Sequence, residues 1–149
     1  MALFVIVRLK GDANLRRDVR YTLKLLGLHK VNHATLQIES PSIKGMLQKA
    51  KDAIAWGEID RETLKNLIMK RGRLPGNKRI SEEFFKQKKI TLDQMVDELL
   101  AGKKKIRDYG LKPIFRLRPT SIDKKRPVAH GGDLGYHGEK INKLINRMI

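Results

Sequence analysis

Cysteine is absent from this chain of 149 residues, and aromatic residues make up only 5% of it. Without cysteine, neither a disulfide framework nor a cysteine-ligated zinc site can form, which fits a cytoplasmic protein. The scarcity of aromatic side chains argues against single-stranded nucleic acid bound mainly through base stacking. The composition therefore excludes two common scaffolds of small domains and offers few platforms for stacked bases.

Acidic residues are also scarce. The chain has 33 Lys and Arg against 16 Asp and Glu, which gives a formal net charge of +17. Such an imbalance destabilises a compact chain through self-repulsion unless a polyanion compensates it. Nucleic acid is the first candidate polyanion, and an anionic membrane surface is the second. Duplex or folded RNA held through its phosphates suits a chain that is rich in cations and poor in aromatics.

Long apolar runs are missing too. No segment approaches the roughly 18 apolar residues of a membrane-spanning helix, and the apolar residues 1–7 are too short for the core of a signal peptide. The length predicts about one domain, and a hydrophobic content of 40% supports a globular fold. We therefore expect a soluble, intracellular protein that has no membrane partner.

Residues 16–56 carry the clearest local signals. An apolar stripe at helical spacing predicts a first helix: Leu15, Val19, Leu23 and Leu26. Gly27 then stands where a helix end favours a residue that adopts a left-handed conformation. Ser40 followed by Pro41 predicts the start of a second helix. Its buried face is expected to comprise Ile43, Met46, Leu47, Ala50 and Ile54.

Two sequence blocks in this stretch carry a resemblance to a known family. LLGLHKVN at residues 25–32, followed by SPSIKGM at residues 40–46, resembles the signature of the L-thirty family of large-subunit ribosomal proteins. AWGE at residues 55–58 and GGD at residues 131–133 are similar to the long archaeal form and to the eukaryotic member called L-seven. The resemblance implies a structural role in the large ribosomal subunit. It also implies large-subunit rRNA, a place close to 5S rRNA, and neighbouring ribosomal proteins as partners.

Strands are predicted at residues 3–9, 34–38 and 114–117. The first is apolar on both faces, which is typical of a central strand, whereas the second alternates like a half-exposed edge strand. Strands joined through helices are ordinarily parallel. The resemblance implies instead a three-stranded, largely antiparallel sheet with the first strand central and both helices on one face. We therefore expect an α+β fold with a small ferredoxin-like βαβαβ core.

Helices are predicted outside this core. Asp60, Ser81 and Thr91 are candidate helix caps, and Thr91 with Gln94 matches a capping box. A last amphipathic helix is expected to bury Ile141, Leu144, Ile145 and Met148. We predict a single rRNA-binding domain over residues 1–149. Its core comprises residues 1–56 and 113–118, with a helical insertion at residues 57–112 and a C-terminal extension at residues 119–149.

Two segments are strongly basic. Residues 71–79 hold four cations and no acid, with two glycines and a proline that permit a tight loop. This loop is either an RNA clamp or a mobile, solvated loop, and the overall charge favours the clamp. The archaeal family also carries a basic, glycine-containing loop at this place. Residues 103–126 hold ten basic and two acidic residues, and part of this segment is expected to order only on RNA.

Single positions complete the candidate interface. Arg16, Arg20 and Lys24 share one face of the first helix, which is either a hydrated face or an RNA contact. Gly45, inside the second helix, costs about 1 kcal/mol relative to Ala, and either close helix packing or close approach of RNA explains it. The predicted rRNA-binding residues are Arg16, Arg20, Lys24, His29, Lys30, Asn32, Lys44, Arg71, Arg73, Lys78, Arg79, Lys103, Lys104, Lys105, Arg116, Arg118, Lys124, Lys125 and Arg126.

Catalytic patterns are not found in the sequence. No nucleophile has a paired base, and no carboxylate pair accompanies His29 and His33 as a metal site would require. GGDLG at residues 131–135 follows no strand and lacks the Lys-Ser/Thr of a P-loop, so it predicts a turn. We expect no enzymatic activity, cofactor, metal or small-molecule substrate. The main alternative is a DNA-binding or chromatin-like protein, which needs a recognition helix that reads bases. An RNA-processing enzyme would need a catalytic constellation.

Overall fold

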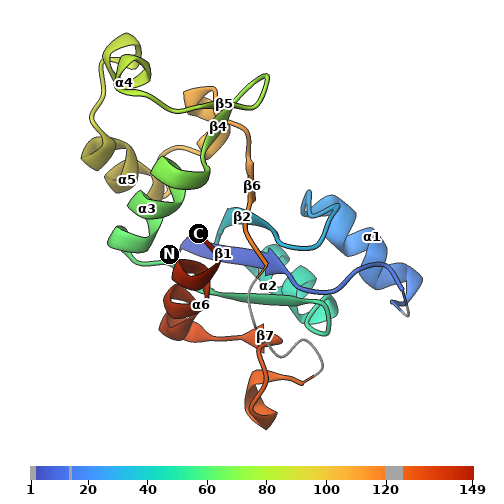
Figure 1. Cartoon of the computed structure of the whole chain (residues 1–149). Helices are drawn as coiled ribbons and strands as arrows, with labels where there is room; N and C mark the ends of the chain where they lie inside the picture. The colour runs from blue at the N-terminus through green and yellow to red at the C-terminus, as the bar shows by residue number, and fades with distance from the viewer. Residues whose placement is uncertain (1–2, 14, 120–125) are drawn as a thin grey trace.

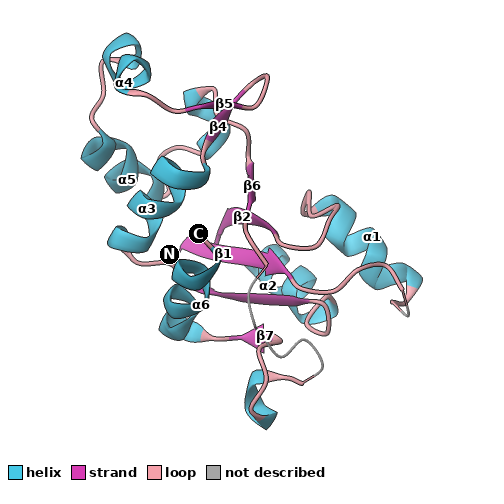
Figure 2. Ribbon diagram, in the orientation of Figure 1, coloured by secondary structure: helices cyan, strands magenta, loops and turns pink. Residues whose placement is uncertain are grey.

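A computed structural model of the chain describes residues 3–13, 15–119 and 126–149. Figures 1 and 2 show its arrangement of helices around a sheet. In chain order the elements are β1 (Leu3–Arg8), α1 (Arg17–Leu25), β2 (His33–Ile38), α2 (Pro41–Lys49), β3 (Ile54–Glu58), α3 (Arg61–Arg71), β4 (Arg73–Leu74), β5 (Lys78–Arg79), α4 (Glu82–Lys88), α5 (Leu92–Leu100), η1 (Ile106–Tyr109), β6 (Ile114–Arg116), η2 (Val128–His130), β7 (Gly135–Tyr136), η3 (Gly138–Lys140) and α6 (Ile141–Met148).

β1 lies at the centre of the main sheet, whose strands follow the order β6-β2-β1-β3-β7. Both of its neighbours are antiparallel to it, and Val5 is paired with Leu36 of β2 and Gly57 of β3. Every residue of β1 is buried because alternate side chains enter two different apolar cores. The predicted central strand and the α+β class are both confirmed.

The first core lies between the sheet and the helices α1 and α2. Phe4 and Ile6 of β1 contribute to it from the sheet side, together with Trp56 of β3. The predicted stripe of α1 and Leu47 of α2 contribute from the helix side. Ser40 Oγ accepts a hydrogen bond from the Ile43 amide at 3.1 Å, as expected for a helix cap. The prediction of two helices on one face of the sheet is confirmed.

The third strand of the βαβαβ core is β3, and the sequence prediction was wrong here. The predicted second helix extended its buried face to Ile54, but α2 ends at Lys49 and Ile54 begins β3. A tight turn separates the two elements, since the Ala53 amide donates to the Ala50 carbonyl at 2.9 Å. Ile54 is buried in the predicted core, but its side chain reaches that core from a strand and not from the preceding helix.

The predicted strand at residues 114–117 does exist, but it extends the sheet from outside the βαβαβ core. It is β6, which pairs antiparallel with β2 through Ala34 and Phe115. β2 is therefore not the edge strand that its alternation predicted. On the other side β7 pairs in parallel with β3, so the described part of the chain has five strands in this sheet rather than three. The division into core, insertion and extension stays a prediction.

The second core lies on the opposite face of the sheet, under α3, α5 and α6. Leu3, Val5 and Val7 of β1 point into it. α3 and α5 contribute Leu64, Leu67, Ile68, Met95, Val96 and Leu99, and α6 contributes the predicted Ile141, Leu144, Ile145 and Met148. The predicted C-terminal helix is confirmed. Asn142 joins it to the end of β3 by donating a hydrogen bond to the Glu58 carbonyl at 3.2 Å, and to the start of α3 by accepting one from the Asp60 amide at 3.0 Å.

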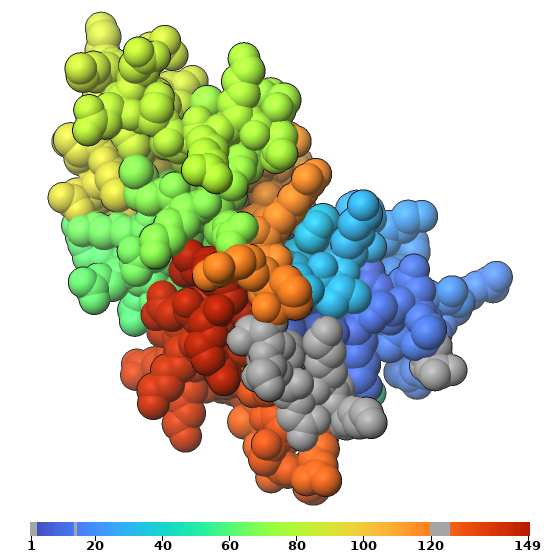
Figure 3. Space-filling model, viewed as in Figure 1, coloured from blue at the N-terminus to red at the C-terminus, as the bar shows by residue number. Residues whose placement is uncertain are grey.

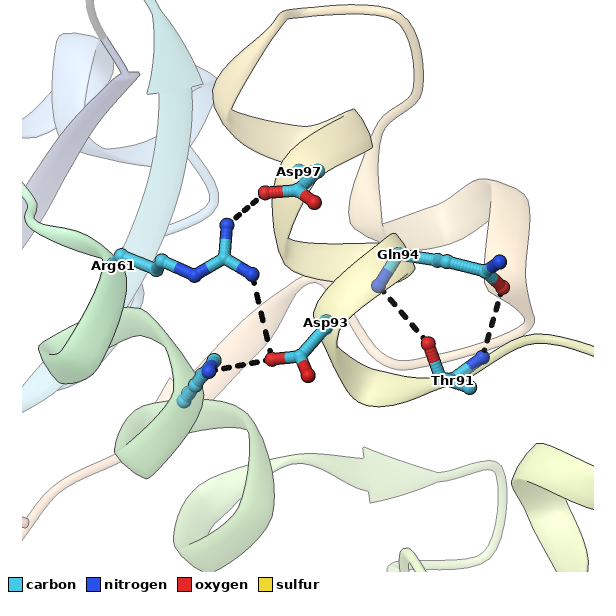
Figure 4. A network of polar contacts seen from close by, with 6 residues as sticks. Arg61, Thr91, Asp93, Gln94 and Asp97 are labelled. Carbon is cyan, nitrogen blue, oxygen red and sulfur yellow. Dashed lines mark hydrogen bonds and ion pairs between the residues drawn. The ribbon is translucent and has the colours of Figure 1, made fainter.

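Charged side chains join α3 to α5 on the outside of this core (Figure 4). Arg61 lies between Asp93 and Asp97 and pairs with both carboxylates. Lys65 also pairs with Asp93, at 2.5 Å. The hydrogen bond from Lys65 and its charge hold the pKa of Asp93 below its ordinary value. α5 itself begins at the predicted capping box, in which Thr91 and Gln94 bond reciprocally.

Arg8, at the end of β1, is a buried charge that ties several loops together. Its Nε donates to the Lys10 carbonyl at 2.7 Å, and one terminal nitrogen donates to the Leu28 carbonyl at 2.9 Å. The other terminal nitrogen bonds Asp12 Oδ1 at 2.6 Å. The Arg8 carbonyl accepts from the Asn32 amide at 2.7 Å. One residue thereby fixes the loop before α1 and the turn between α1 and β2.

Arg8→Met is expected to destabilise the protein by about 1–3 kcal/mol, because it leaves the buried Leu28 carbonyl without its donor. The matched control is Asp12→Asn, which removes only the exposed carboxylate of the pair, and exposed pairs contribute little. Chemical unfolding of the two variants measures the difference. Equal stability losses would show that the ion pair, rather than the two carbonyl contacts, gives Arg8 its role.

Candidate nucleic-acid interface

The predicted basic loop at residues 71–79 is a β-hairpin. β4 and β5 are antiparallel, with Arg73 paired to Arg79, and Gly76 and Asn77 at the tip have positive φ angles of 83° and 62°. Leu74 packs against the second core and anchors the hairpin, while Lys78 and Arg79 are exposed. The sequence predicted a tight, glycine-dependent segment, but the strand pairing was not predicted.

Four arginines gather at the base of this hairpin: Arg71, Arg73, Arg79 and Arg118, here called the arginine cluster. Burial lowers the pKa of Arg71, and the positive charges of Arg118, Arg73 and Arg79 lower it further. Arg118 follows β6, so the fold brings the two predicted basic segments together. Among the described residues no ion pair to an acid is formed by any of the four.

The hydrogen bonds of the arginine cluster go to main-chain oxygens. Arg73 donates to the carbonyls of Lys70 and Gly72 at 3.2 and 2.9 Å, and Arg118 donates to the Ile149 main-chain oxygen at 2.7 Å. The Nε of Arg71 is buried and has no hydrogen-bond partner in the described structure. Main-chain oxygens therefore hold the cluster in place, and within the described residues no Asp or Glu side chain compensates its positive charge.

A second group of positive and titratable side chains lies around Arg116, the last residue of β6. It comprises His29, Lys30, His33 and Arg116, here called the turn cluster. β2 and β6 place His33 opposite Arg116. Burial lowers the pKa of His33, and the charge of Arg116 followed by that of Lys30 lowers it further. His29, Lys30 and Arg116 are exposed, so the predicted contacts of the turn and of β6 share one surface.

Asn32 stands between β1 and β6. It adopts a positive φ of 67°, its amide donates to Arg8, and its carbonyl accepts from the Leu117 amide at 2.9 Å. Its side-chain oxygen is buried without a hydrogen-bond partner among the described residues. The structure therefore gives Asn32 a main-chain role in joining two strands, and its predicted RNA contact stays a prediction.

The predicted cations of the two core helices are exposed. Arg16, Arg20 and Lys24 lie on the outer face of α1, with Arg16 at the N-cap position and 3.6 Å from Asp18. Lys44 of α2 pairs with Glu39 at 2.6 Å, which partly neutralises it. Arg17 is not among the predicted residues but is also exposed on α1, and its position directly after Arg16 is the signal that could have indicated it.

Gly45 occupies an exposed position of α2. A Cβ built at this glycine meets no atom within 4 Å. Close packing within the described part of the chain therefore does not explain the glycine. The sequence left two explanations open, close helix packing and close approach of RNA. The close approach of RNA stays a prediction.

The remaining predicted cations differ in their surroundings. Lys103, Lys104, Lys105 and Arg126 are exposed, but Lys104 is engaged by Glu98 at 3.6 Å and by the ring of Tyr109. Lys124 and Lys125 lie outside the described residues. Figure 3 shows that the β6 segment (orange) lies between the hairpin (yellow-green) and the residues before β2 (light blue) on one face of the molecule.

The glycine-rich segment near the C-terminus forms a turn, as the sequence predicted. A Cβ at Gly132 would lie 2.0 Å from the Arg126 carbonyl oxygen, so only glycine allows the backbone to pass this close to residue 126. The described residues contain no group of three or more side chains suited to a metal ion. None of the helices in that part of the chain has the length and apolar character of a membrane span.

Comparison with known proteins shows which family this chain is similar to. Residues 4–54 match the family model described as ribosomal protein L30p/L7e. A large ribosomal subunit protein uL30 of Nanoarchaeum equitans is 45% identical over 155 aligned residues that cover both chains completely. The uL30 proteins of Methanococcus vannielii and Thermofilum pendens are each 43% identical, over 98% and 100% of this chain and 99% and 100% of their own lengths.

Proposed function

The chain belongs to the L30p/L7e family of ribosomal proteins, and on this premise we propose that it binds large-subunit rRNA through the hairpin, β6 and the outer face of α1. Its role is that of a structural protein of the large ribosomal subunit, and it is not an enzyme. Neighbouring ribosomal proteins are its other partners. A position close to 5S rRNA is part of the proposal and is supported by the resemblance of the two sequence blocks at residues 25–32 and 40–46.

The observation that carries this proposal is the arginine cluster. The four guanidinium groups have no Asp or Glu partner among the described residues, and burial, together with the repulsion from Arg118, Arg73 and Arg79, lowers the pKa of Arg71. Phosphate oxygens would supply the missing negative charge, and a planar guanidinium can bind two of them at once. Because Arg73 and Arg118 are already oriented by main-chain oxygens, little ordering would be needed when the phosphate backbone binds.

The turn cluster adds further cations to the proposed RNA-binding surface. Arg116 and Arg118 lie at successive outward positions along and after β6, and Arg116 belongs to the turn cluster while Arg118 belongs to the arginine cluster. These cations come from three different elements, a hairpin, a strand and a turn, and such a distribution suits the phosphates of folded RNA. A single recognition helix inserted into a DNA groove would gather them on one helix instead. This distribution favours RNA over the DNA-binding alternative.

The first test is the salt dependence of binding to an in vitro transcript of archaeal large-subunit rRNA. If six to ten phosphates are neutralised, affinity should fall roughly 10³- to 10⁵-fold between about 50 and 200 mM salt. Duplex DNA of equal charge serves as the competitor, and co-sedimentation with washed large subunits tests the site. Equal affinity for DNA and RNA would favour the chromatin-like alternative, and a flat salt response would contradict phosphate contact.

The second test removes Lys78 and Arg79 together by substitution with Ala. Both are exposed, so stability should change by less than about 0.5 kcal/mol. The salt slope of RNA binding should fall by up to about 0.9 for each lost phosphate contact. The control is Lys86→Ala with Lys88→Ala, which removes the same charge from exposed positions of α4. Equal effects of the two double variants would mean that total charge, and not the hairpin, governs binding.

The third test addresses Gly45. Gly45→Ala should stabilise the free protein by up to about 1 kcal/mol, since Ala is the better helix former and its Cβ meets no atom within 4 Å. RNA affinity should move in the opposite direction, and Gly45→Leu should weaken binding more than Gly45→Ala. A melting curve and an RNA titration of each variant provide the comparison. Wild-type affinity in the Leu variant would exclude close approach at this point.

A further inference from the structure

α1 exposes two apolar side chains among its cations. Tyr21 is 62% exposed and Leu25 is 59% exposed. They are four positions apart, so they are neighbours on the helix surface. Val19 and Leu23 on the opposite side of α1 fill the first core. The amphipathic pattern of the helix therefore accounts for the buried stripe and leaves Tyr21 and Leu25 without a role in the fold.

Tyr21 differs from the other exposed tyrosine. The ring of Tyr136 lies 6.0 Å from that of Trp56, and its hydroxyl donates to Glu58. Within the described residues Tyr21 has neither a hydrogen bond nor a ring contact, since the aromatic and cation–π contacts found there involve other residues. An exposed ring with no intramolecular partner carries an unfavourable apolar surface, which a ligand would cover.

The charge around Tyr21 indicates what kind of ligand this is. Arg17 lies one turn before Tyr21, Arg20 directly before it and Lys24 one turn after it, and all three are exposed. Asp18, the nearest acid in the sequence, accepts a hydrogen bond from the Val19 amide at 2.9 Å and lies 3.6 Å from Arg16. An aromatic ring flanked by cations is complementary to a nucleobase flanked by phosphates.

We propose that Tyr21 stacks on one unpaired base of the bound RNA, while Arg17, Arg20 and Lys24 contact the flanking phosphates and Leu25 packs beside the base. This inference rests on the proposed rRNA binding and adds a base contact to a surface otherwise built for phosphates. It agrees with the low aromatic content, because a single ring suffices for one base. Paired bases inside a duplex are covered by their neighbours, so the partner is a loop, bulge or end of the RNA.

The experiment compares Tyr21→Ala, Tyr21→Leu and Tyr21→Phe with the wild-type protein on the archaeal rRNA transcript. The Ala and Leu variants should lose roughly 5- to 150-fold in affinity, the range expected for one stacked base. The Phe variant should keep the wild-type affinity because it keeps the ring. None of them changes charge, so the salt slope should stay unchanged. Melting curves check that all variants are folded, as expected for an exposed position.

Photocrosslinking gives an independent measurement. With 5-iodouridine in place of uridine in the transcript, the crosslink should fall on the tryptic peptide of residues 21–24. If the Leu variant kept the wild-type affinity, a simple apolar contact rather than stacking would explain the role of this position, and the inference would be overturned. So would wild-type affinity in the Ala variant, or crosslinks confined to other peptides.

The outcomes also separate this inference from the proposed function. Steep salt dependence with no effect of the Tyr21 variants would leave rRNA binding standing and overturn only the stacked base. Variants that bind the transcript normally but enter large subunits poorly would identify this face as a contact for another protein, which also overturns it. Absence of transcript binding by the wild-type protein would overturn both.

Discussion

β1 buries both of its faces, and the two helical layers of the molecule depend on that burial. Phe4 and Ile6 hold α1 and α2 on one side, while Leu3, Val5 and Val7 support α3, α5 and α6 on the other. The strand ends at Arg8, whose guanidinium holds the loop before α1 and the turn after it. The exposed His29 and Lys30 project from that turn, so a buried arginine sets the geometry of a part of the proposed RNA surface.

Features that depend on a few neighbouring residues could be predicted from the sequence. Ser40 caps α2 because its side chain reaches an amide three residues away, and Gly27 takes the left-handed conformation required after α1 with a φ of 81°. The capping box of Thr91 and Gln94 is equally local. The periodicity of apolar side chains predicted the buried faces of α1 and α6, since burial on a helix follows a fixed repeat.

Features that depend on distant residues could not be predicted in this way. Ile54 lies in helical register with α2 although it begins β3, and only the turn at Ala50 shows where the helix ends. Nothing in the local pattern of β7 reveals that Gly135 pairs with Ala55. The arginine cluster is also nonlocal: Arg71 and Arg118 are 47 positions apart, and β6 must join the sheet before they become neighbours. The sequence therefore identified the two basic segments but did not show that they lie next to each other in the folded protein.

The positive charge of the chain is distributed in two different ways. On α3, Arg61 and Lys65 face Asp93 and Asp97, so these cations and acids stabilise one another within the protein. Among the described residues the arginine cluster bonds main-chain oxygens and no Asp or Glu side chain, and its mutual repulsion opposes folding wherever no anion is bound. A ligand that binds only the folded state stabilises that state in proportion to its affinity. The same repulsion that weakens the free protein thus becomes a source of binding free energy when phosphates neutralise the cluster.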